Sequence, residues 1–138
     1  MELHLSLCNL ITKASRVVVR QYQQKLAHLG ISPSQGGVVY MLSLIGDSSQ
    51  VEIARRLYLE KTNVNAMVRK LEKAGFVTVE KESDDTRKSR VCLTAAGREL
   101  AAELTEIDRQ MGAEYQALAG SEPDAAIIRR YLEGILDA

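Results

Sequence analysis

The stretch SQVEIARRLYLEKTNVNAMVRKLEKAGFVTVEKESDDTRKSRVCLT, residues 49–94, holds the strongest structural signal in this chain of 138 residues. Ser49 and Glu52 fit a capping box, in which each side chain bonds the backbone N–H of the other residue. A short helix is therefore expected to begin at Ser49. Its apolar face is made by Ile53, Ala54 and Leu57.

A second amphipathic helix is predicted over Lys61–Ala74, because at about 100° per residue its apolar and polar side chains separate into two arcs. The apolar arc holds Val64, Met67, Val68, Leu71 and Ala74. The opposite arc holds Thr62, Asn65, Ala66, Arg69 and Lys73, with Asn63 and Lys70 on its flank. Short hydrogen-bonding side chains followed by cations suit a helix that enters a DNA major groove. An ordinary solvated helix has a similar pattern, so the flanking elements must decide.

A β-hairpin is predicted directly after this helix. Gly75 can end the helix in the left-handed conformation. The β-branched runs Phe76–Lys81 and Arg90–Leu93 then read as paired strands around a polar tip. Arg87 and Lys88 on this tip are candidate DNA contacts, since a cation beside a recognition helix can reach the minor groove. Helix, turn, helix and hairpin in this order predict a winged helix-turn-helix.

These residues resemble the MarR family of bacterial transcription regulators, and the resemblance covers nearly the whole chain. Its densest parts are VEIARRLYLEKTNVNAMVRKLEKAGFV and DTRKSRVCLTAAGREL. The family pattern Asp-x-Arg before Leu-Thr corresponds here to Asp85, Arg87, Leu93 and Thr94. The resemblance implies an obligate homodimer whose recognition helices read a pseudo-palindromic operator, with wing arginines in the minor groove. We interpret Asp85 as an acceptor that orients an arginine. Thr86 departs from the family, where this position is often basic, which implies a weaker grip by the wing.

Long helices are predicted on both sides of this segment. Leu3–Leu29 reads as one helix, Ser32 and Pro33 open the next, Thr94 opens a long one, and Ser121 caps the last. The apolar stripes of the first and last helices need a partner, either a second copy of the chain or other parts of the same chain. We therefore expect one mainly α domain, residues 1–138, with a small β-hairpin wing. Residues 32–94 would form the DNA-binding lobe, and 1–31 and 95–138 the helical dimerisation region.

Charge and composition agree with a DNA-binding protein in the cytoplasm. The net charge is zero, but Val51–Val91 carries ten Lys or Arg and seven Asp or Glu, whereas the remainder carries eight and eleven. The positive charge is thus shifted toward the proposed DNA face. No apolar run is long enough for a membrane span, and a secretory signal is not evident. Two distant cysteines do not make a disulfide framework.

The residues argue against several other classes of function. The sequence shows no phosphate-binding glycine loop, nucleophile elbow or metal-ligand spacing, so no enzymatic activity, cofactor or metal is expected. A winged helix used for protein assembly without DNA is the rival class. It would expose an apolar or acidic helix face, and Thr62, Asn65, Arg69 and Lys73 count against it. We expect a transcription regulator, most simply a repressor that a small phenolic compound or a hydroperoxide releases.

Cys8 has two interpretations. Leu7-Cys8 with Ala14-Ser15-Arg16 resembles the organic-hydroperoxide-sensing branch of the family, in which a reactive cysteine lies early in the first helix. In that branch two tyrosines hydrogen-bond the cysteine across the dimer. Tyr22 matches one of them, and Thr12 stands at the position of the other. The alternative is that Cys8 is a small apolar residue in a dimer seam. Cys92 is predicted to be an unreactive strand residue.

Overall fold

The computed structural model describes residues 3–81 and 89–138. The chain forms two compact units, Met1–Ala102 and Glu103–Ala138. No helix in the described residues is both long and apolar enough to cross a membrane. The assignment of residues 32–94 to a DNA-binding lobe and of both termini to dimerisation stays a prediction.

The elements follow the predicted order. They are α1 (Leu7–Leu26), the 3-10 turn η1 (Ala27–Leu29), α2 (Pro33–Ile45), α3 (Gln50–Leu57), α4 (Lys61–Lys73), β1 (Val77–Lys81), β2 (Ser89–Leu93), α5 (Ala95–Leu118) and α6 (Glu122–Leu136). The mainly α fold with a two-stranded hairpin is therefore confirmed.

The first helix is shorter than predicted from the sequence. It begins at Leu7 because the Ser6 hydroxyl caps it, accepting from the backbone N–H of Asn9 at 3.2 Å. At the other end the last turn tightens into η1, and Gly30 closes it with a φ of 69°. The predicted single helix over Leu3–Leu29 was therefore wrong at its start and in its last turn.

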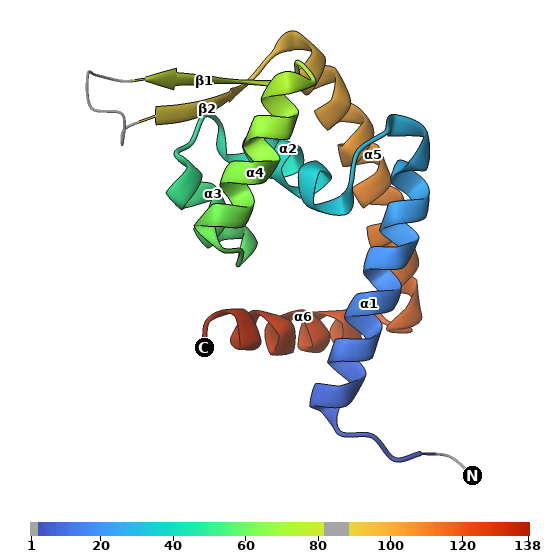
Figure 1. Ribbon diagram of the computed structural model, residues 1–138. Coiled ribbons are helices and arrows are strands. Elements are labelled where there is room, and N and C mark those ends of the chain that lie inside the picture. Colours follow the sequence, from blue (N-terminus) through green and yellow to red (C-terminus); the bar gives the residue numbers. More distant parts are fainter. Residues whose placement is uncertain (1–2, 82–88) are drawn as a thin grey trace. The chain divides into compact units, whose positions relative to one another are not determined.

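Helices α2, α3 and α4 pack around a small apolar core in the first unit (Figure 1). Ser32 and Gln35 form a complete capping box that starts α2. Gly36 lets α1 approach closely, because a Cβ there would lie 2.7 Å from the Tyr22 hydroxyl. The fully buried side chains of this core are Leu26, Val38, Val39, Ile53, Val64, Val68 and Leu71.

The hairpin pairs β1 and β2 in antiparallel register, from Val77 opposite Leu93 to Lys81 opposite Ser89. The loop after α2 adds one further bridge, since Ser48 and Val91 exchange two backbone hydrogen bonds of 3.2 and 2.7 Å. This bridge joins the wing to the helical part of the lobe. In Figure 1 the hairpin extends beside the C-terminal end of α4.

A tight corner joins α4, β1 and α5. Gly75 takes the left-handed conformation, with a φ of 87°, as predicted. Thr94 locks the corner: its hydroxyl donates to the Gly75 carbonyl at 2.6 Å and accepts from the Gly97 backbone N–H at 3.0 Å. A Cβ at Gly97 would overlap the Phe76 carbonyl oxygen. The start of α5 is therefore held against the end of α4 by backbone contacts.

The second unit contains the end of α5 and α6. Gly120, with a φ of 87°, turns the chain between them, and the Ser121 hydroxyl caps α6 by accepting from the Asp124 N–H at 3.2 Å. The apolar side chains predicted on α6 are each between 43% and 55% exposed: Ile127, Ile128, Tyr131, Leu132, Ile135 and Leu136. This helix therefore presents an uncovered apolar surface.

Candidate nucleic-acid interface

Helix α4 separates its side chains into the two predicted faces. Val64, Val68 and Leu71 are at most 1% exposed. The candidate DNA contacts Thr62, Asn63, Ala66, Arg69 and Lys73 are exposed, and Asn65 is half-buried. The prediction for the apolar arc was wrong at one end, because Ala74 is exposed as the C-cap residue of the helix. The exposed face thus combines amide and hydroxyl groups near the N-terminus with cations further along.

A concave site lies beside the N-terminus of α4, and we call it the N-terminal cleft. It has a volume of about 430 Å³ and is lined by Ser49, Gln50, Val51, Lys61, Thr62, Asn65 and Ser89. Glu60, at the N-cap of α4, makes no side-chain cap bond, so the first N–H groups of α4 remain open to a ligand. Hydroxyls, backbone N–H groups and the Lys61 ammonium together suit the oxygens of a backbone phosphate.

The sequence did not identify Gln50, Val51 and Ser89 as candidate site residues. Their place in the cleft depends on how α3 crosses α4 and where β2 begins, which are tertiary features. The one clue in the sequence was the predicted helix cap at Ser49. The Ser49 hydroxyl accepts from the Glu52 N–H at 3.1 Å, which fixes the N-terminus of α3 beside the cleft.

The second half of the predicted capping box was wrong. The Glu52 carboxylate accepts from Arg55 at 2.7 and 3.1 Å and from Arg56 at 2.8 Å instead of reaching back to Ser49. These bonds lower the pKa of Glu52 to about 2. The pairing therefore stabilises α3 above the ordinary carboxyl pKa and is lost as the pH falls toward 2. The cluster is solvent-exposed, so its contribution is small.

Tyr58 forms the turn between α3 and α4. Tyr58 is 63% exposed and adopts the left-handed conformation, with a φ of 56°, at the C-cap of α3. Its backbone N–H donates to the carbonyls of Ala54 and Arg55 at the end of that helix. The residue thus serves as a helix terminator where glycine would be the usual choice.

The candidate wing residues Arg87, Lys88 and Asp85 lie outside the described residues. Their roles stay predictions. At the base of the wing Arg90 pairs with Asp47, with 3.6 Å between Nη2 and Oδ2. This pair connects β2 to the loop that follows α2.

A single chain does not bring the candidate redox residues together. Cys8 is exposed. The Thr12 hydroxyl donates to the Cys8 backbone carbonyl at 2.9 Å. Tyr22 lies fourteen residues further along α1, which is a rise of about 21 Å. A sensor site made of Cys8, Thr12 and Tyr22 would therefore need a second copy of the chain.

Cys92 differs from Cys8 in both burial and proton affinity. It is 9% exposed. Burial, with a smaller effect of the nearby Asp47 carboxylate, raises the pKa of the Cys92 thiol to about 11. The thiol therefore stays protonated near neutral pH, and protonated thiols are poor nucleophiles. This supports the prediction of an unreactive strand cysteine.

Comparison with known proteins gives the family. The chain is 28% identical over 116 residues to the HTH-type transcriptional regulator SarZ of Staphylococcus saprophyticus, covering 82% of this chain and 77% of that protein. It is 26% identical over 107 residues to the organic hydroperoxide resistance transcriptional regulator of Bacillus subtilis, covering 78% and 73%. The MarR family model matches residues 31–89. The chain is therefore similar to MarR-family regulators.

The fold agrees with this similarity over nearly the whole chain. MepR of S. aureus, solved as a complex with DNA, superposes with a TM-score of 0.87 over 97% of this chain and 98% of that one, at 23% identity. The MarR family consists of DNA-binding transcription regulators. The predicted winged helix-turn-helix and the general class of function, a DNA-binding transcription regulator similar to the MarR family, are therefore confirmed.

Proposed function

We propose that this MarR-family protein is a homodimeric repressor that reads a pseudo-palindromic operator through α4. The observation that carries the proposal is the division of α4 into a buried apolar face and an exposed face of amides and cations. A helix of this kind, held by its apolar side, can insert its polar side into a major groove. A protein-assembly role would call for an apolar or acidic exposed face.

The side chains divide into those that read bases and those that position the backbone. Asn65 and Arg69 have the donors and acceptors to pair with adenine and guanine edges. Lys73 and the N-terminal cleft would bind phosphates, and such contacts fix the register on DNA without reading its sequence. Arg87 and Lys88 would enter the minor groove, with Asp85 orienting an arginine.

A homodimer would cover the apolar surfaces that the chain leaves open. Leu7, Leu10, Val17 and Val18 of α1 are 37–61% exposed, and the six apolar side chains of α6 are similarly exposed. Contiguous apolar surface of this kind mostly marks an interface. Two copies related by two-fold symmetry would place two α4 helices on one face of the operator. A small effector that changes the spacing between them would release DNA.

The binding mode has a direct test in salt dependence. We expect binding to the DNA upstream of the protein's own gene to weaken as salt rises, because bound cations release counterions. Arg87→Ala should weaken binding and reduce the slope of log affinity against log salt by about one. Fluorescence anisotropy with labelled duplex measures both quantities. Equal slopes for the variant and the parent would remove the wing from the interface.

Peroxide sensing through Cys8 is a second candidate, favoured by the exposure of this thiol, whereas the thiol of Cys92 is buried and protonated. We expect an organic hydroperoxide to oxidise Cys8 to a sulfenic acid and release DNA. Cys8→Ser should keep DNA binding and lose the response, whereas Cys92→Ser should change neither. Treated protein that stays on DNA with Cys8 still a free thiol would exclude this sensor and favour a small phenolic acid as effector.

A further inference from the structure

The base of the wing is joined to the loop between α2 and α3 by a series of hydrogen bonds. At the end of α2 the Gly46 N–H donates to the Leu42 carbonyl at 2.9 Å, and the Ser48 hydroxyl donates to the Gly46 carbonyl at 2.8 Å. Ser48 and Val91 then exchange the two backbone bonds described above. The end of α2 is therefore linked to the middle of β2, and we call this junction the wing base.

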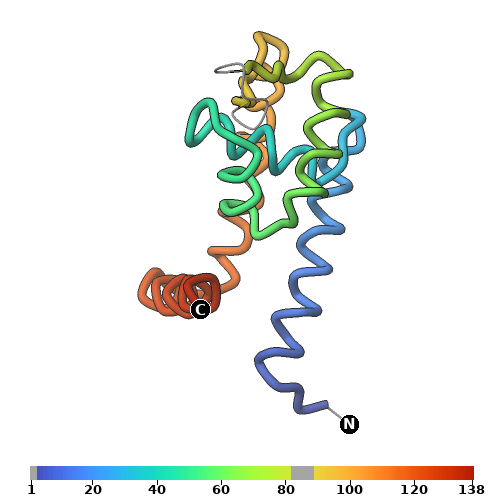
Figure 2. Tube along the Cα trace, turned by 60° about the vertical axis from the view of Figure 1, so that its left-hand side comes forward, coloured from blue at the N-terminus to red at the C-terminus, as the bar shows by residue number. Residues whose placement is uncertain are grey.

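The position of the hairpin depends on contacts at the wing base. A two-stranded hairpin is marginally stable by itself and needs support from other elements. Helices α2 and α3 contact β2, and α4 contacts β1. In both views the hairpin and the N-terminal end of α1 lie at opposite ends of the first unit (Figures 1 and 2). The part of the lobe formed by α2, α3 and α4 must therefore set the direction of the wing.

The two faces of the hairpin differ in character, because successive side chains of a strand point to opposite faces. Val77 and Val91 share one face and are at most 1% exposed. Arg90 and Cys92 lie on the other face of β2, and Glu80 stands opposite Arg90 in the register. The outer face of the wing base thus carries charged groups beside a thiol that is only 9% exposed.

The side chain of Asp47 adds a second attachment at this outer face. It precedes Ser48, whose backbone makes the bridge, and its carboxylate pairs with Arg90 at 3.6 Å. Burial first, and then the same carboxylate, raise the pKa of the Cys92 thiol, so Asp47 also lies near that side chain. Two adjacent loop residues therefore hold β2, one through its backbone and one through its side chain. Together they resist a rotation that a single bridge would allow.

We propose that Asp47 is a positioning residue for DNA binding, which through Arg90 fixes the angle at which the wing leaves the helices of the lobe. The proposal rests on the contact between wing and DNA in the proposed function and names the residue that aligns the wing. The two side chains of the pair are 45% and 47% exposed, so the pair adds little to the stability of the fold. Its effect should appear in DNA binding, because a wing aligned in advance loses less freedom when it binds.

The affinity of Asp47→Asn for the upstream DNA gives the first test. Removal of a carboxylate from a DNA-binding lobe should by itself strengthen binding to phosphates, whereas release of the wing should weaken it. We expect binding about two- to fivefold weaker than that of the parent, the range that an exposed ion pair supplies. Asp47→Glu keeps the carboxylate and should bind more tightly than Asp47→Asn. Binding by Asp47→Asn as tight as that of the parent, or tighter, would overturn the proposal.

Glu60→Gln controls for the loss of charge. Glu60 is exposed in the same lobe and makes no side-chain cap bond at the start of α4. Its substitution removes a carboxylate without touching the wing base, so binding should be as tight as that of the parent or tighter. Weaker binding by Asp47→Asn than by Glu60→Gln supports a role in positioning.

A double-mutant cycle with Arg87→Ala separates the proposal from the proposed function. A wing that lacks Arg87 gains less from alignment, so Asp47→Asn should weaken binding less in the Arg87→Ala chain than in the parent chain. If Arg87→Ala alone has no effect, the wing contact of the proposed function fails. If Arg87→Ala weakens binding but the effect of Asp47→Asn is equal in both chains, only the positioning role of Asp47 is overturned.

The thiol of Cys92 reports on the wing base in the absence of DNA. In a Cys8→Ser chain Cys92 is the one remaining cysteine, and iodoacetamide labels it when local opening exposes it. Arg90→Gln removes the ion pair and should make labelling at least about twofold faster. Because Arg90 also lowers the pKa of Cys92, the rates are compared at equal thiolate fraction, taken from the pH dependence of labelling.

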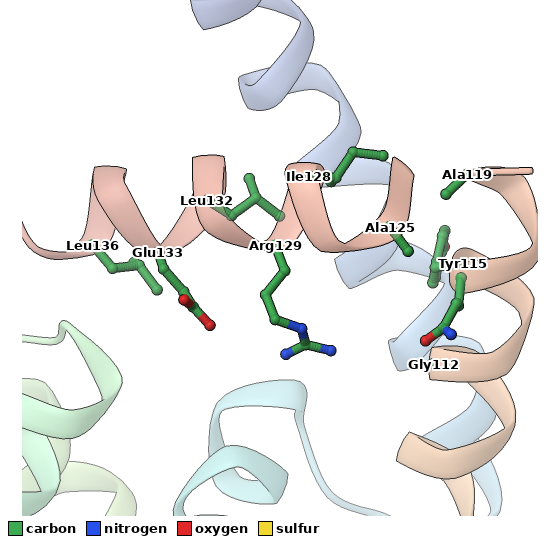
Figure 3. Close-up of a pocket in the computed structure, with 10 residues that line it drawn as sticks. Gly112, Tyr115, Ala119, Ala125, Ile128, Arg129, Leu132, Glu133 and Leu136 are labelled. Atoms are coloured by element: carbon green, nitrogen blue, oxygen red, sulfur yellow. The ribbon is translucent and has the colours of Figure 1, made fainter. Parts of the chain in front are cut away.

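Arg129→Gln is the matched control for labelling. Arg129 is exposed in the second unit, where it lines an apolar groove of about 460 Å³ between the end of α5 and α6 (Figure 3). Its substitution removes the same charge without touching the wing base, so Cys92 should be labelled at the rate of the parent. Faster labelling in Arg90→Gln alone supports the proposal. Equal rates in Arg90→Gln and Arg129→Gln would show that the wing base is held without the ion pair and would overturn it.

Discussion

Gly97→Ala should lower the free energy of unfolding by about 3 kcal/mol or more, because the new methyl group cannot be accommodated without moving backbone. A Cβ at this position would overlap the Phe76 carbonyl oxygen and lie 3.1 Å from Leu93 Cδ2. The same carbonyl accepts the Thr94 N–H at 3.0 Å. The substitution would therefore separate α5 from the corner that supports both α4 and the wing.

Gly37→Ala is the matched control within the same unit. Gly37 is also helical, but a Cβ there would meet Leu57 Cδ2 at 3.9 Å, an ordinary contact. Alanine should raise stability by about 0.5–1 kcal/mol through its better helix propensity. Urea denaturation followed by circular dichroism measures both variants. Equal stabilities for the two variants would show that the backbone around Gly97 can shift at little cost and that this corner does not hold the lobe together.

Arg69→Ala should cost about 1–3 kcal/mol of specific DNA binding if the guanidinium contacts guanine bidentately. Arg69 is exposed on the polar face of α4, one turn beyond Asn65, and Val64, Val68 and Leu71 on the opposite face are at most 1% exposed. Loss of the side chain should relax discrimination at one position of each half-site. Thermal stability and dimerisation should remain at the level of the parent.

The control for this prediction is Arg109→Ala, which removes the same charge from α5. The Arg109 side chain is 66% exposed and pairs with Glu106 at 2.6 Å. It belongs to α5 and is not one of the proposed DNA contacts. Competition binding against single-base variants of the operator separates specific from general effects. If Arg69→Ala unfolds the protein or leaves its base preference intact, the assignment of α4 as the reading helix is wrong.

Local sequence signals were enough to predict most of the fold. Ser32 and Ser49 fix helix starts through side-chain caps, and Gly75 fixes a helix end. The arcs of α4 follow from helical periodicity alone, because one side must be buried against α2 and α3. The exposed candidate residues on α4 were predictable for the same reason.

Other features, some of them local and some tertiary, could not be predicted from the sequence. The Glu52 carboxylate accepts hydrogen bonds from Arg55 and Arg56 and not from the Ser49 backbone N–H, because two cations compete with one neutral donor. The N-terminal cleft needs three elements to converge, and the role of Gly97 depends on a carbonyl twenty-one positions earlier. Tyr58 ends α3 in the left-handed conformation, which the spacing of apolar residues in the sequence does not predict.

The central claim is that two copies of α4 read one operator together. Hydroxyl-radical footprinting of the protein on its upstream DNA tests this claim most directly. We predict two protected patches on one face of the duplex, related by two-fold symmetry and centred about 34 Å apart. A single protected patch, or even protection along the whole fragment at a salt concentration where specific complexes persist, would contradict it.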